Sequence, residues 1–416
     1  MQTMKQLEES SCNFRRIGQG FCGSVWAAEG GKVAMKRENG GPGRSILTDY
    51  NMHRLVLDAA SQDEVKVNVC VPRWPRFVEN NDPWWHSNLA IFPKRYAACN
   101  ILCSERIPPL SKEVRDILID RYCPPSSIAT IKNNDADRDC LVRLYLGRRK
   151  IQNSGRRGLN FFSLRNYPLH LNQAEELGLQ ILNYACDMAD MLARMHWTAK
   201  IDANDVEFVI GGIQETTIGE HTHSLFGRHA LWLLDFDCCR PLAMDDAGVT
   251  QAARAFLRND PYFPRPAIEG SSDHALWMKF RSQYLESSKA RVGLCDAKYL
   301  SLPEQFINQV EESHHETMKR KQSASHSCQS IHRRYRIPPA NLRSFGQTTE
   351  SRFRRRENLV EDGIAVEWDI FVRSEFGSGQ SFSGSELWEG HNWRHQMQVV
   401  VLALPPLNTQ SGNDTT

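Results

Sequence analysis

The sequence predicts an α+β fold of two lobes, with a small β-rich N-lobe followed by a larger, mainly helical C-lobe. Three observations predict it: alternating segments punctuated by glycine near the start, helical apolar periodicity from residue 112 onward, and a length of 416 residues, which suits two or three domains. We expect the N-lobe over residues 1–110 and the C-lobe over 111–314. Residues 315–416 are expected to form a basic, low-complexity and largely disordered extension.

The N-lobe begins with segments in which apolar and polar residues alternate, and Gly30-Gly31 marks a turn between two of them. Strands are therefore predicted at residues 14–20, 22–28 and 32–37. After a loop rich in Gly and Pro, apolar residues at helical spacing predict a helix over residues 46–60. The stretch 65–102 is expected to contain further strands, broken by a polar loop.

In the C-lobe, the clearest helical periodicity covers residues 173–196, where a broad apolar stripe recurs. Further helices are expected at residues 112–122, 250–257 and 274–285. Two short apolar runs, at 206–210 and 231–236, predict a hairpin. A last strand-like element is expected at 398–404.

Composition favours an ordinary globular protein, since hydrophobic residues make up 41% and charged residues 24%. No run approaches the roughly 20 apolar residues of a membrane helix, and the amino terminus lacks the apolar core of a secretory signal. The 12 cysteines are scattered, unlike those of a secreted disulfide scaffold. We therefore expect a soluble intracellular protein, cytoplasmic or nuclear, that does not contact a membrane.

The net charge of +2 hides an asymmetry, because residues 319–356 hold eleven Lys or Arg and one acid. Such a segment can attract nucleic acid, an acidic partner or an import receptor through electrostatics that do not depend on sequence. We expect any such contact through this tail to be weak. The alternative is a solvated linker that keeps the chain soluble.

A glycine-rich motif with the pattern G-x-G-x-x-G-x-V contains Gly18, Gly20 and Gly23. Glycines let a backbone close over phosphates with no side chain in the way. A dinucleotide-binding fold would need a helix to begin at the third glycine. A strand is expected there, so that fold is disfavoured, and the remaining alternative is a glycine-rich hairpin without a ligand.

A V-A-x-K segment follows and ends at Lys36, thirteen residues after Gly23. In protein kinases, a lysine on the third strand reaches the α and β phosphates of ATP beneath such a loop. We therefore expect the three glycines and Lys36 to bind a nucleotide. A carboxylate usually orients this lysine; Asp49 is the nearest candidate, although it could equally be solvated. The alternative for Lys36 is an edge-strand lysine that discourages aggregation.

Three acids stand where a kinase would carry its catalytic groups. Asp202 and Glu207 have the five-residue spacing of the Asp and Asn in the kinase loop H-R-D-L-x-x-x-N, although the preceding His and Arg are absent. Asp235 opens a D-F-D sequence where kinases have D-F-G. We expect Asp202 to be the catalytic base and Glu207 with Asp235 to bind Mg²⁺. The alternative is that these acids cap turns beside short strands.

Eight segments carry a wider resemblance: FRRIGQGFCGSVW, VAMK, DYNMH, CLVRLYLGRR, FFSLRNYPLHL, MHWTAKIDANDVEFVIG, WLLDFDCCRP and FLRNDPYFPRP. Together they resemble the fungal domain-of-unknown-function family 3669, whose members often carry the name "zinc finger protein", over residues from about 12 to 310. The resemblance implies a protein-kinase-like fold and no established reaction. Asp202, Glu207 and Asp235 lie in the family's motif blocks. The family more usually has Asn at the position of Asp237.

Zinc is not expected, because a structural site needs paired Cys or His at close spacing. Cys99 and Cys103 have no second pair at a suitable distance, and Cys238 and Cys239 are adjacent. A third group lacks a fourth ligand and consists of His326, Cys328 and His332.

Two functions from different classes follow. The first is a divergent kinase-like enzyme that uses ATP and Mg²⁺ to phosphorylate a hydroxyl of an unidentified substrate. The second is a catalytically inactive, pseudokinase-type module that binds an unidentified protein partner and keeps the acids for structure. The glycine loop with Lys36 favours the first, and the altered catalytic loop favours the second.

Overall fold

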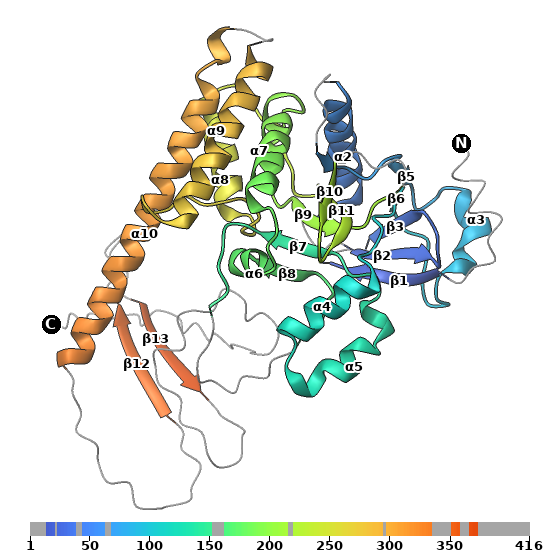
Figure 1. The fold of residues 1–416 in the computed structure, drawn as a ribbon, viewed down its shortest axis with the longest axis horizontal. Coiled ribbons are helices and arrows are strands. Elements are labelled where there is room, and N and C mark those ends of the chain that lie inside the picture. Colours follow the sequence, from blue (N-terminus) through green and yellow to red (C-terminus); the bar gives the residue numbers. More distant parts are fainter. Residues whose placement is uncertain are drawn as a thin grey trace, which may run out of the picture. The chain divides into compact units, whose positions relative to one another are not determined.

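The computed structural model describes residues 14–20, 23–38, 44–62, 68–151, 162–214, 219–293, 297–334, 351–357 and 366–372. The chain divides into two compact units, Met1–Tyr335 and Arg336–Thr416, and its fold is α+β (Figure 1). In the second unit, β12 (Ser351–Glu357) and β13 (Val366–Val372) form an antiparallel pair. The strand expected at 398–404 lies outside the described residues.

The first sheet is antiparallel and has the strand order β1-β2-β3-β6-β5. Its strands are β1 (Phe14–Gln19), β2 (Gly23–Ala28), β3 (Val33–Glu38), β5 (Arg76–Val78) and β6 (Ile101–Glu105). The turn before β3 contains Gly30 at φ +65°, which explains the glycine there. Trp26 and Met35 pack with Trp85 and Phe92. Trp85 belongs to the short helix α3 (Trp84–Asn88), and Phe92 follows the short helix η1 (Leu89–Ile91).

Helix α2 (Ile46–Ser61) confirms the helix predicted after β3. It begins where the hydroxyl of Ser45 accepts the backbone N–H of Thr48 at 3.3 Å, a typical N-terminal cap. Ile46, Asp49 and Val56 lie on its buried face. The helix therefore places one carboxylate toward the protein interior.

A second sheet has the order β10-β11-β9-β7-β8, and β4 pairs in parallel with β11. Its strands are β4 (Val69–Cys70), β7 (Val142–Tyr145), β8 (Tyr167–His170), β9 (Glu207–Gly211), β10 (Glu220–His223) and β11 (Gly227–Leu234). The two apolar runs pair as β9 and β11, but they do not form the predicted hairpin, because β10 lies between them in the chain and is the hairpin partner of β11. The sequence did not predict β7 and β8, because runs of four residues are too short for an alternating pattern to stand out.

The remaining helices belong to the first unit. They are α4 (Lys112–Tyr122), η2 (Pro125–Ser127), α5 (Ile128–Lys132), η3 (Asp135–Asp137), α6 (Leu171–Glu176), α7 (Ile181–Trp197), α8 (Asp246–Arg258), α9 (Ser272–Val292), η4 (Ala297–Tyr299) and α10 (Leu302–Arg334). The expected single helix over 173–196 is two helices, because Gly178 at φ +77° interrupts it. Helix α10 passes through residue 315, where regular structure was expected to end. Within the described residues, no helix has the length and apolar character to cross a bilayer.

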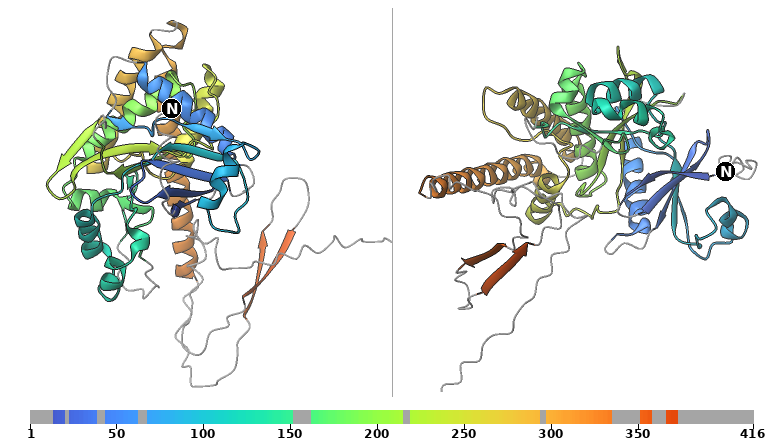
Figure 2. Two further views of the ribbon diagram at one scale, coloured as in Figure 1. Left: turned by 90° about the vertical axis from the view of Figure 1, so that its right-hand side faces the viewer. Right: turned by 90° about the horizontal axis from the view of Figure 1, so that it is seen from below.

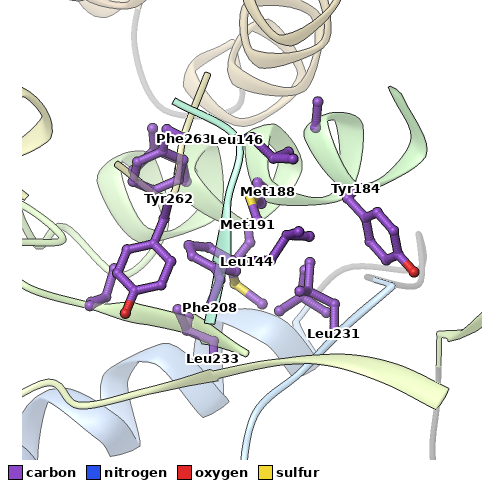
Figure 3. Close-up of a cluster of buried hydrophobic side chains, with 14 of the residues drawn as sticks. Leu144, Leu146, Tyr184, Met188, Met191, Phe208, Leu231, Leu233, Tyr262 and Phe263 are labelled. Carbon is purple, nitrogen blue, oxygen red and sulfur yellow. The ribbon is translucent and has the colours of Figure 1, made fainter. Parts of the chain in front are cut away.

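Helix α7 packs on the second sheet and forms the largest part of the core (Figure 3). Its Met188 and Met191 lie among Leu144 of β7, Phe208 of β9 and Leu233 of β11, all fully buried. Burying each such side chain contributes roughly 1.5–3 kcal/mol. Helices α8, α9 and α10 lie beyond α7, on the side away from the first sheet (Figures 1 and 2). This packing fixes β9 and β11, whose ends carry acidic residues.

Candidate functional site

A cavity of about 470 Å³ is lined by residues of both sheets of the first unit. Strands β1, β2 and β3 form one wall, and the start of β9 and the segment after β11 form another. The predicted residues that line it are Gly18, Gly20, Gly23, Lys36, Glu207 and Asp235. Asp202 is not among the lining residues. The structure thus brings six of the seven predicted residues to one cavity.

Lys36 lies between two carboxylates at the centre of this cavity wall. Its Nζ is 2.5 Å from Oδ2 of Asp49 and 2.5 Å from Oδ1 of Asp235. The other oxygen of Asp49 accepts the backbone N–H of Phe236 at 3.1 Å. The side chain of Asp49 is 3% exposed, so the alternative of a solvated Asp49 is wrong. Because β3 lies between β2 and β6, Lys36 is not an edge-strand lysine either.

The charges of this triad stabilise one another. Burial by itself lowers the pKa of Lys36, but the nearby carboxylates of Asp235 and Asp49 raise it well above its usual value. Burial would raise the pKa of Asp235, and the ammonium of Lys36 reverses this, so that the pKa is lowered. An ammonium ion therefore persists at neutral pH, where the phosphates of a ligand could reach it.

Glu207, the first residue of β9, pairs with Arg143 of the neighbouring strand β7. Burial raises the pKa of Glu207 to about 7, and the guanidinium of Arg143 opposes this shift. Glu207 and Asp235 interact electrostatically and line the same cavity. Two carboxylates facing one space are the hard oxygen donors that Mg²⁺ prefers. One oxygen of each carboxylate already accepts from a basic side chain, Arg143 for Glu207 and Lys36 for Asp235.

Of the three glycines in the motif, Gly23 is the one that a residue with a side chain cannot replace without a clash against backbone. A Cβ atom built on it would lie 2.0 Å from the backbone oxygen of Arg37 on β3. Gly20 differs, because nothing lies within 4 Å of a Cβ built there. Gly23 therefore allows β2 and β3 to pair, whereas Gly20 leaves open space on the cavity side.

Asp202 holds the loop before β9 in place. Its Oδ1 accepts the backbone N–H groups of Asn204 at 3.1 Å and Arg240 at 2.9 Å, and its Oδ2 accepts Nε2 of Gln251 at 2.9 Å. The residue is 4% exposed. In this conformation both carboxylate oxygens have partners inside the protein.

Arg44, two residues before the start of α2, connects this helix to the loops that carry Asp205 and Asp237. It donates to Asp205 at 2.7 Å and to Asp237 at 3.1 Å. Asp237 occupies the position of the glycine in a kinase D-F-G motif, and its side chain is completely buried. Asp205 has φ +62°, a strained conformation for a non-glycine residue. The single guanidinium of Arg44 therefore pairs with acids on two different loops.

The segment after β6 closes the other end of the cavity. The carbonyl of Pro108 accepts the N–H of Gly212 at 2.7 Å, and a Cβ on Gly211 would lie 2.7 Å from Cγ2 of Ile107. Ile107 itself lines the cavity.

An ion-pair cluster lies at the same end. Asp139 accepts from Arg106, which follows β6, at 2.7 Å and also from Arg15 of β1. Arg106 and Asp139 both line the cavity. The cluster therefore joins three segments that are far apart in the chain.

Sequence reasoning missed Arg44, Arg143 and Asp139. Each pairs with a residue that is distant in the sequence. Asp139 is separated from Arg106 by 33 positions, Arg143 from Glu207 by 64, and Arg44 from Asp205 by 161. Arg143 lies in the segment CLVRLYLGRR, but no local pattern indicates the partner of any of the three. Only the fold reveals these partners.

The cysteines considered for zinc that the structure describes are free thiols. Burial raises the pKa of Cys103 to about 12 and that of Cys238 to about 11, and it raises the pKa of Cys239 well above its usual value. The side chains of His326, Cys328 and His332 lie outside the described part of the structure.

Comparison with known proteins gives one match. A family model described as "Zinc finger protein", the domain-of-unknown-function family 3669, matches residues 231–293. These residues include Asp235, Asp237 and the helices α8 and α9. No curated protein and no solved structure matches the chain. The similarity thus covers the wall that carries Asp235 and supplies no activity.

Proposed function

We propose that this chain is a divergent kinase-like protein that binds ATP with Mg²⁺ in the cavity and transfers a phosphoryl group to a hydroxyl. The observation that carries the proposal is the position of Lys36, held between Asp49 and Asp235 beneath the glycine-rich strands. A lysine in this setting is the phosphate-binding group of protein kinases.

The strand order supports a kinase-like arrangement. In the order β1-β2-β3-β6-β5, the lysine lies on the third strand and the next helix, α2, supplies its carboxylate. Protein kinases pair a third-strand Lys with a Glu of the following helix. Asp49 replaces that Glu with a side chain one methylene shorter.

The charges of the side chains that line the cavity support a requirement for a divalent cation. The lining holds four basic residues, Lys36, Arg106, Arg143 and Arg165, and five acids, Asp49, Glu105, Asp139, Glu207 and Asp235. With all groups ionised the lining carries −1, so it has no excess positive charge to attract the phosphates of a free nucleotide, whereas one Mg²⁺ on Glu207 and Asp235 would supply it.

The proposed roles follow from position. Gly18 and Gly20 give the phosphates room, and Lys36 contacts the α and β phosphates. Bound Mg²⁺ would neutralise charge on the transferred phosphoryl group. Asp202 is the exception, because it does not line the cavity: to accept the proton of the substrate hydroxyl, it would have to release Gln251 and reach the cavity.

The second candidate is a catalytically inactive module that binds nucleotide or a protein partner. One observation favours it: Asp202 is buried, and three hydrogen bonds occupy its oxygens. In this case the carboxylate only shapes the loop.

Two measurements test these proposals: the thermal shift with ATP and Mg²⁺, and ATP turnover in the presence of candidate hydroxyl substrates. We expect a stabilisation that is lost in Lys36→Met and kept in Lys112→Met, an exposed lysine that pairs with Asp116. No shift for the wild-type protein would refute nucleotide binding. Turnover that Asp202→Asn abolishes without changing the thermal shift supports the enzyme, and binding without turnover supports the inactive module.

A further inference from the structure

Asp235 has a backbone conformation that a residue with a side chain rarely adopts. Its φ is +68°, in the left-handed region, and such a conformation persists only where the surroundings hold it. We propose that His53 is a positioning residue that acts through the ring of Phe236 and so keeps the carboxylate of Asp235 in the cavity. The service of this carboxylate to a nucleotide with Mg²⁺ rests on the proposed function, whereas the link between His53 and Asp235 does not.

Helix α2 holds the segment of Asp235 at two points. The carboxylate of Asp49 accepts the backbone N–H of Phe236 at 3.1 Å. One turn further along the helix, the imidazole ring of His53 lies 5.0 Å from the ring of Phe236, with 32° between their planes. Residues four positions apart lie on the same face of a helix, so both contacts come from the buried face of α2. A movement of Phe236 would therefore break both.

His53 is itself held from a second side. Its Nε2 lies 2.6 Å from the carbonyl oxygen of Pro72, and Nε2–H is the donor because a carbonyl only accepts. The residue is 3% exposed. The imidazole is thus fixed between a carbonyl group and an aromatic ring, with little freedom to turn.

The contacts of His53 join the ends of two paired strands. Pro72 follows β4 by two residues, and β4 pairs in parallel with β11. Strand β11 ends directly before Asp235. His53 bridges the two ends, because its ring contacts Phe236 and its N–H contacts Pro72. Removing His53 would therefore leave Asp235 attached to β11 but no longer tied to the end of β4.

A neutral histidine suits both contacts. Burial lowers the pKa of His53, although the carboxylate of Asp49 and the carbonyl of Pro72 oppose this shift. The neutral ring carries one N–H, which matches the single carbonyl acceptor. Glutamine could donate to that carbonyl without a ring, whereas phenylalanine would supply a ring without a donor. These two substitutions therefore separate the two contacts.

The first test measures the affinity of the full chain for ATP with Mg²⁺ by calorimetric titration. We expect His53→Gln, which loses the ring, to bind about tenfold more weakly than the wild type, and His53→Phe to recover most of the affinity. The double variant His53→Gln, Asp235→Asn should bind no more weakly than Asp235→Asn alone, because His53 acts through Asp235. Effects that multiply would overturn the proposal, since His53 would then act on the ligand by itself. The control is His86→Gln, an exposed histidine of α3, which should bind normally.

A second measurement needs no ligand. Hydrogen–deuterium exchange, followed by mass spectrometry on a peptide that contains Phe236, reports how often its N–H leaves Asp49. We expect about tenfold faster exchange in His53→Gln than in the wild type and in His53→Phe, with unchanged exchange in β9. Equal exchange at Phe236 in all three proteins would overturn the proposal.

A further variant keeps the idea testable if His53→Gln does not fold. Phe236→Leu removes the same ring contact from the other side, so it should weaken binding and speed exchange to the same extent. Wild-type exchange and affinity in this variant would contradict the role of the ring contact. If the wild type does not bind ATP with Mg²⁺, the proposed function fails, but the exchange rates still decide the role of His53.

Discussion

Glu207 and Arg143 meet inside the cavity, where adjacent strands β9 and β7 place a carboxylate against a guanidinium. Burial favours the neutral form of Glu207, and Arg143 favours its charged form. The pair therefore holds a largely buried carboxylate against a fixed positive charge in the cavity wall. Neither residue is paired with a sequence neighbour, so the fold alone creates this contact.

Arg143→Met should lower the free energy of unfolding by about 2 kcal/mol, because it leaves a largely buried carboxylate without its charged partner. Urea denaturation at pH 7.5 measures this. The matched control is Arg121→Met, whose exposed pair with Glu176 should contribute little. Equal losses in the two variants would contradict a stabilising role for the buried pair.

Two glycines of the same motif should respond differently to alanine. Gly23→Ala places Cβ 2.0 Å from a backbone oxygen of β3, so we expect a loss of roughly 2 kcal/mol or more from disrupted strand pairing. Gly20→Ala meets no atom within 4 Å and should change stability by less than about 1 kcal/mol. It should instead weaken the binding of ATP with Mg²⁺. Chemical denaturation and calorimetric titration of both variants separate the two effects.

Asp49→Asn should weaken the binding of ATP with Mg²⁺ by about tenfold, equivalent to about 1.4 kcal/mol. The amide oxygen can still accept the N–H of Phe236, but Lys36 loses one of its two carboxylates. Equilibrium titration measures the affinity. Asp58→Asn, an exposed position on the same helix, is the control and should bind normally. Equal affinities of the two variants would show that Asp49 does not position Lys36.

Stability should fall in acid partly because of His229. This residue is fully buried on β11; its Nδ1–H donates to the carbonyl of Gly227 at 3.0 Å, and its Nε2 accepts the hydroxyl of Tyr184 at 2.5 Å. Burial lowers its pKa to about 4. The folded pKa lies below the ordinary 6.5, so this contribution is complete above about pH 6.5 and is lost as the pH falls through 4.

His229→Gln removes that titration, so between pH 7 and pH 4.5 the wild type should lose about 2 kcal/mol more than the variant. Urea denaturation at both pH values measures the difference. An equal loss in both proteins would show that His229 does not contribute to acid sensitivity.

The sequence predicted those parts of the fold and site whose signal is local. The alternating pattern around Lys36 and the helical spacing around Asp49 are both visible within short stretches of the sequence. Asp235 likewise belongs to a three-residue motif, D-F-D. The break at Gly178 was missed because apolar periodicity continues across it. Arg143 and Arg44 could not be predicted, because ordinary arginines acquire their roles from partners that only the folded chain brings near.

Pro108 and Pro109 link the first sheet to the rest of the unit, and the carbonyl of Pro108 accepts the N–H of Gly212. Proline fixes φ, so two of the torsions about which this crossing could bend are locked. We therefore expect the cavity to change little in width when a ligand binds. Association in stopped-flow mixing should follow one exponential whose rate rises linearly with ligand concentration, without the plateau that a slow closing step imposes.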